Sequence, residues 1–148
     1  MARTIVILFA VGVAASAQSN NDCVYALGKS LSLMPVKDCY AKNAGYYKTF
    51  STKPECKNMD IYPGTYQAAN CDGWIRNICL CIAKNSGLLT SAFTFDTDVF
   101  NSQVLKGKCN GNSLYQTAYN RCYAEAMQRF NFMRLVACLR YAVLQIPA

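Results

Sequence analysis

Apolar residues recur along much of this chain at steps of three and four, the spacing that places side chains on one face of an α-helix. The segment from Asp72 to Lys84 shows this pattern most clearly, and Gly87 follows it as a left-handed helix end. An earlier apolar series runs from Cys23 to Met34 and stops at Pro35. The pattern therefore predicts a helical core, with the helix at 72–84 at its centre.

Shorter helices are predicted between these two and after them. One runs from Val36 to Asn43 and ends at Gly45, another begins near Pro54, and a third passes from Val99 to Leu105. Residues 91–95 alternate briefly, which fits a short strand or an extended loop, and we favour the loop.

The last helical stretch begins at Ser113 and continues past Met133. Its two cysteines, Cys122 and Cys138, are sixteen positions apart, which is about 160° around a straight helix. Either the helix bends near Asn131 or the two cysteines serve opposite faces, and we expect the bend.

The chain has 148 residues, no internal repeat and no Pro-, Ser- or Gly-rich linker. Residues 1–17 have the form of a signal peptide: a positive start, an apolar run at 4–14 and a small-x-small cleavage site at Ala15-Ser16-Ala17. A membrane span needs about 20 apolar residues, so we expect cleavage and secretion, with no transmembrane segment in the mature chain. The expected product, residues 18–148, is one compact all-α domain of about five or six helices stabilised by disulfides.

Nine cysteines follow the predicted signal, and eight of them can form four disulfides whose connectivity the spacing does not define. The ninth is either buried and free or forms a disulfide-linked homodimer, and the sequence favours neither outcome. Cys79 and Cys81 point roughly 200° apart on a helix, so we expect them to bond two different neighbours. The nine are Cys23, Cys39, Cys56, Cys71, Cys79, Cys81, Cys109, Cys122 and Cys138.

The chain has no histidine, which removes the usual general base and the Ser-His-Asp, Cys-His and two-histidine mechanisms. Glu55 and Glu125 are the two glutamates that could serve as a glycosidase pair, and both are predicted on exposed helical positions. We therefore expect no catalytic residues. Cys71, Cys79 and Cys81 could bind zinc, but oxidation competes, so we also expect no metal and no cofactor.

The net charge is +7, and most of the basic residues are lysines spread over the first half or arginines on the last helical stretch. Neither group is dense enough to predict nucleic-acid binding. An acidic extracellular partner remains compatible with this charge.

The leading hypothesis is a secreted, non-enzymatic protein that holds an apolar small molecule inside the helical domain. The same apolar residues could equally well fill an ordinary core. Two alternatives are a venom-type or effector protein that acts on a receptor or membrane through its basic surface, and a structural extracellular protein crosslinked through the odd cysteine. The candidate pocket residues are Trp74, Phe93, Phe95, Phe100, Met127, Phe130 and Met133.

Overall fold

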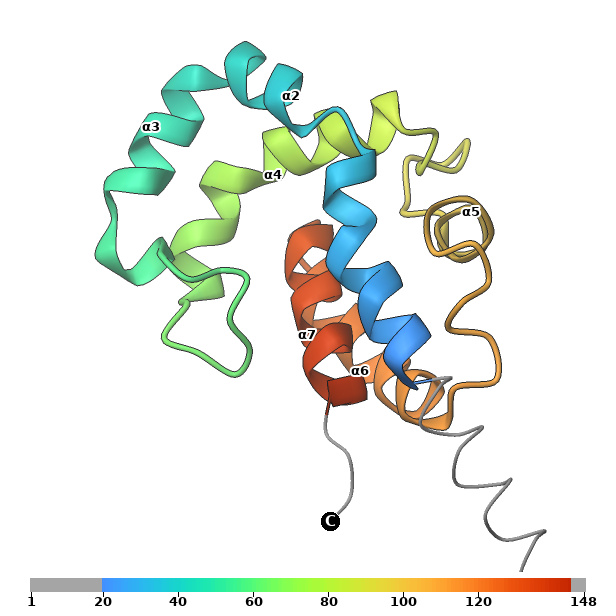
Figure 1. The fold of residues 1–148 in the computed structure, drawn as a ribbon. Helices are drawn as coiled ribbons and strands as arrows, with labels where there is room; N and C mark the ends of the chain where they lie inside the picture. Colours follow the sequence, from blue (N-terminus) through green and yellow to red (C-terminus); the bar gives the residue numbers. More distant parts are fainter. Residues whose placement is uncertain (1–19, 145–148) are drawn as a thin grey trace, which may run out of the picture.

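The computed structural model describes residues 20–144, and within that range the chain folds into seven α-helices with no strand (Figure 1). This confirms the predicted all-α, disulfide-stabilised fold, with more helices than the five or six expected. The predicted signal peptide, residues 1–17, lies outside the described residues. After the first helix (residues 20–30), the elements are η1 (Leu31–Leu33), α2 (Val36–Lys42), α3 (Ala44–Thr52), η2 (Pro54–Cys56), α4 (Ala68–Asn85), α5 (Thr97–Val99), η3 (Phe100–Val104), α6 (Ser113–Met127) and α7 (Phe132–Leu144).

Helix α4 is the predicted central helix, although it begins four residues before Asp72. It packs against α2 and α3, and the left-handed end expected at Gly87 is present, with φ +67°. Its apolar stripe is fully buried at Ile75, Ile78, Cys79 and Ile82.

The prediction that Gly45 ends a helix is wrong, because Gly45 lies in the first turn of α3. The chain breaks at Asn43, whose side-chain Nδ2 donates to the Cys39 carbonyl at 2.9 Å, and a new helix begins at Ala44. Phe50 anchors this helix in the core, 8% exposed and 6.4 Å from the ring of Tyr66. Burial of the phenylalanine offsets the low helix propensity of glycine.

The bend predicted near Asn131 is a complete break. Helix α6 ends at Met127 and α7 begins at Phe132, so the two form a helical hairpin (Figure 1). The reversal brings Cys122 and Cys138 together as a disulfide, with their Cα atoms 5.7 Å apart. The 160° separation of a straight helix therefore does not apply.

The loop expected at 91–95 is confirmed, apart from an isolated bridge between Leu89 and Phe95. Asp96 caps α5 by accepting a hydrogen bond from the Val99 amide at 3.0 Å. The helix then continues into η3, a single π-helical turn.

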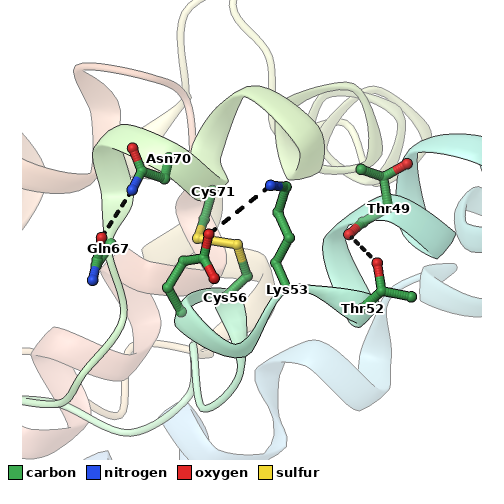
Figure 2. Close-up of polar contacts among 8 residues, drawn as sticks. Thr49, Thr52, Lys53, Cys56, Gln67, Asn70 and Cys71 are labelled. Atoms are coloured by element: carbon green, nitrogen blue, oxygen red, sulfur yellow. Dashed lines mark hydrogen bonds and ion pairs between the residues drawn. A yellow bond between two sulfur atoms is a disulfide. The ribbon is translucent and has the colours of Figure 1, made fainter.

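Four disulfides form, as predicted: Cys23–Cys109, Cys39–Cys81, Cys56–Cys71 and Cys122–Cys138. Figure 2 shows Cys56–Cys71 joining η2 to the start of α4. The ammonium of Lys53 also forms an ion pair with Glu55 of η2 at 3.9 Å.

Cys79 is the free cysteine and is 0% exposed. The expectation that both Cys79 and Cys81 bond neighbouring segments is therefore wrong for Cys79. A disulfide-linked homodimer through the odd cysteine is likewise not supported, because its thiol is inaccessible.

Burial raises the pKa of Cys79 from 9.0 to about 12. As the pH rises, the Cys79 thiol loses its proton in the unfolded chain at a lower pH than in the folded protein. The free energy of unfolding is therefore expected to fall as the pH rises above about 9. The slope contributed by this group is at most about 1.4 kcal/mol per pH unit. Urea unfolding at pH 8 and pH 10 measures it.

A Cys79→Ala variant is the control, because burial also raises the pKa of tyrosines, to about 12 for the partly buried Tyr40. The variant should lose less stability between the two pH values than the original chain. Equal losses would contradict the prediction, as would a thiol that reacts with Ellman's reagent before the chain unfolds.

A buried polar network joins α4 to the start of α7. The Nδ2 of Asn131 donates to Oδ1 of Asp72 at 2.7 Å and to the Tyr66 hydroxyl at 3.1 Å. Tyr66 also donates to Asp72 at 2.5 Å. Nearby, the Arg134 guanidinium donates to the Met59 and Ile61 carbonyls at 3.1 and 2.7 Å. These bonds hold the loop after η2 against α7.

Candidate functional site

The predicted pocket residues are divided between core and surface. Phe95 lies 5.4 Å from Phe100 and 5.9 Å from Phe132 between ring centroids, and all three rings are buried. Phe93 instead is 72% exposed. Of the others, Phe130 and Met133 are buried, whereas Trp74 and Met127 are partly buried against the core.

The structure therefore brings Phe95 and Phe100 together but separates them from Phe93. Trp74 lies elsewhere, beside Tyr46 at 6.4 Å between ring centroids. A ligand pocket at the seven predicted residues stays a prediction.

A groove of about 490 Å³ lies between the first helix and residues 104–108. We call it the lysine groove. The first helix and η1 contribute one wall, and the end of η3 with the following turn contributes the other. Its lining residues are Asp22, Tyr25, Ala26, Lys29, Ser32, Leu33, Val104, Leu105, Lys106 and Lys108.

The two walls of the lysine groove are joined covalently and by polar contacts. The Cys23–Cys109 disulfide links them with a Cα separation of 4.6 Å. Asn112 Nδ2 donates to Asn20 Oδ1 at 2.7 Å, and the Lys108 ammonium lies 3.6 Å from the Asp22 carboxylate. The groove is therefore held open without a ligand, which lowers the ordering entropy that binding has to overcome.

The backbone beside the groove is irregular. The π turn of η3 leads into Lys106, whose φ of +51° is in the left-handed region that lysine rarely adopts. Gly107 continues at φ +66°, and its amide donates to the Asn101 carbonyl at 2.9 Å. Such irregular turns concentrate at functional sites. Here they place two lysines, Lys106 and Lys108, at the edge of the groove.

Large apolar side chains in the groove remain in contact with solvent. Tyr25 is 68% exposed and Leu33 is 61% exposed, whereas Leu105 at the floor is 1% exposed. Exposed apolar residues gathered in a concave site are typical of a binding surface.

The charge of the groove is positive, with three lysines and one aspartate in its lining. Lys29 lies over the Tyr25 ring, 5.8 Å from its centroid. A negatively charged group would therefore be attracted to this site.

A second hollow of about 660 Å³ adjoins the lysine groove, because Ser32 lines both. We call it the proline hollow. Its lining is largely apolar, from Leu31, Met34, Pro35 and Val36, with Lys37 and Asp38 as the charged members.

The sequence prediction missed the lysine groove because it followed the buried stripe of the first helix. The missed signal is on the opposite face, where Tyr25, Lys29 and Leu33 recur at steps of four. Two large apolar residues on a face expected to be polar indicate a binding surface.

The residues considered for catalysis or zinc have other partners. Glu55 pairs with Lys53 at 3.9 Å, and Glu125 accepts a hydrogen bond from Tyr62 at 2.7 Å. Cys71 and Cys81 are in disulfides, which leaves no zinc site at the three cysteines considered.

Comparison with protein families, with curated proteins and with solved structures finds no match for this chain. Between residues 20 and 144, no helix combines the length and apolar character that crossing a bilayer requires.

Proposed function

We propose that this protein is a secreted, non-enzymatic binding protein that holds an apolar small molecule in the lysine groove. The observation that carries this proposal is a preformed groove with a buried apolar floor and two exposed apolar residues, Tyr25 and Leu33, on its wall. Four disulfides make the domain suited to an oxidising extracellular medium.

The non-enzymatic part of the proposal is supported by the side chains present. The chain has no histidine, and the buried carboxyl group of Asp72 is occupied by hydrogen bonds from Tyr66 and Asn131. The groove itself offers lysines, an aspartate and apolar surface, which are groups suited to recognition.

Replacing Leu33 with aspartate is expected to weaken binding of the neutral dye N-phenyl-1-naphthylamine at least tenfold. Burying a leucine side chain against a ligand contributes about 1.5 to 3 kcal/mol, and the aspartate removes that contribution. Because Leu33 is 61% exposed, the substitution should leave the fold intact. Dye fluorescence titration measures the affinity.

The matched control is Leu144→Asp, which changes a leucine that is 53% exposed on α7 outside the groove. It should bind the dye as the original chain does. No dye binding by the original chain would overturn the proposed function, and so would equal binding by the Leu33 variant.

A further inference from the structure

We infer that the ligand of the lysine groove is a single-chain carboxylate, such as a fatty acid, with its head beside Lys106 and Lys108 and its tail running past Ser32 into the proline hollow. This inference rests on the proposed function and specifies the chemical class of the ligand. It is carried by the distribution of charge and apolar surface along the two adjoining hollows.

The head position follows from the location of the lysines. Lys108 follows η3, and its ammonium lies 3.6 Å from the carboxylate of Asp22 at the start of the first helix. Lys106 is two residues before it, exposed, and forms no ion pair with another residue of the described range. Asp22 therefore partly neutralises Lys108, whereas Lys106 keeps its full charge. This end of the groove is positively charged as a result. A carboxylate supplies the complementary charge.

The tail position follows from the other end of the groove. Ser32 and Leu33 lie about 15 Å further along the first helix and η1, at a rise of about 1.5 Å per residue. There the apolar residues Met34, Pro35 and Val36 line the adjoining hollow. A flexible chain can pass from one hollow to the next along Ser32. A compact ring system would fill one hollow and leave the other unused.

The concave shape favours a single molecule over a lipid surface. Tyr25 and Leu33 line a groove whose opposite wall, with Val104 and Leu105, is tied to the first helix through Cys23–Cys109. Residues that insert into a bilayer instead project from a convex or flat face. We therefore assign the apolar surface to one chain held between two walls.

The first test compares dodecanoate with dodecanol, which has the same chain and no charge. The affinity of each compound is measured by its displacement of the neutral dye, at concentrations of the compound below its critical micelle concentration. Dodecanoate is expected to bind about tenfold more tightly, since each exposed ion pair contributes up to about a fivefold gain. This preference should disappear in Lys106→Gln/Lys108→Gln and shrink at high salt, whereas dodecanol binding stays unchanged.

The matched control is Lys48→Gln/Lys57→Gln, which removes the same charge from exposed positions outside both hollows. It should keep the tenfold preference. Equal binding of dodecanoate and dodecanol by the original chain would overturn the carboxylate inference and leave the proposed function standing. Binding of neither compound together with failure to bind the dye would overturn both.

The second test concerns the tail. Affinity is expected to rise about two- to fourfold per methylene from octanoate to dodecanoate, because each buried methylene adds hydrophobic free energy. Ser32→Trp, which fills the passage between the hollows, should weaken dodecanoate much more than octanoate. If the affinity did not change with the length of the carboxylate chain, the position assigned to the tail would be overturned. Binding to phosphatidylglycerol vesicles without binding of monomeric dodecanoate would show that the occupant is a lipid surface.

Discussion

Replacing Asn131 with leucine is expected to lower the free energy of unfolding by about 3 kcal/mol. Asn131 is 0% exposed, and its amide donates to Asp72 and Tyr66 at 2.7 and 3.1 Å. Its Oδ1 also accepts a hydrogen bond from the backbone amide of Arg134 at 3.1 Å, which caps α7. Leucine has a similar size, so the loss comes from hydrogen bonding, with little contribution from a cavity.

The magnitude combines two effects. Leaving a buried polar group such as Asp72 with fewer partners costs about 1 to 3 kcal/mol. Losing a helix cap costs about 1 kcal/mol. Denaturant unfolding, followed by circular dichroism, measures the sum.

Asn112→Ala is the matched control. Asn112 is 2% exposed and caps α6 through the Tyr115 amide at 2.9 Å, but its side-chain partner Asn20 is a neutral amide that is only half-buried. The control should lose about 1 kcal/mol. Equal losses in the two variants would show that the Asp72 network contributes little to stability.

The second large effect is expected from removal of the Cys23–Cys109 disulfide by alanine at both positions. The cysteines are separated by 86 residues in sequence. On the chain-entropy model, opening a loop of that length lowers the free energy of unfolding by about 4 to 5 kcal/mol. The same change should weaken dye binding, because this disulfide joins the two walls of the lysine groove.

The comparison variant replaces Cys56 and Cys71 with alanine. This disulfide spans 15 residues and lies away from the groove, so it should cost about 3 kcal/mol and leave dye affinity unchanged. Thermal and denaturant unfolding give the stabilities, and fluorescence titration gives the affinities at a temperature where both variants are folded. Equal loss of dye affinity in both variants would contradict the role assigned to Cys23–Cys109.

The helices with strong apolar periodicity could be predicted from the sequence. The stripe in α4 depends on local spacing, and the left-handed residue at Gly87 depends on the backbone freedom of glycine. Helix α3 could not be predicted in the same way, because Phe50 is placed by a distant partner, Tyr66. The break before Phe132 likewise depends on the hydrogen bond from Asn131 to Asp72, which is 59 residues away in sequence.

The candidate site was less accessible to prediction than the fold. Its lysines come from two segments, Lys29 on the first helix and Lys106 and Lys108 after η3, which local patterns cannot bring together. The aromatic residues predicted to line a pocket were chosen by composition, and composition does not distinguish Phe100 in the core from Phe93 in solvent.

By itself, the amino-acid sequence determined that the chain is helical and rich in cysteine, and that it lacks histidine chemistry. These properties depend on residue type and on spacing over a few positions. The tertiary structure alone decided which cysteine stays free, where the last helical stretch reverses, and which lysines share a groove. Each of those outcomes depends on contacts between segments far apart in the chain, whose pairing is set by packing of the whole core.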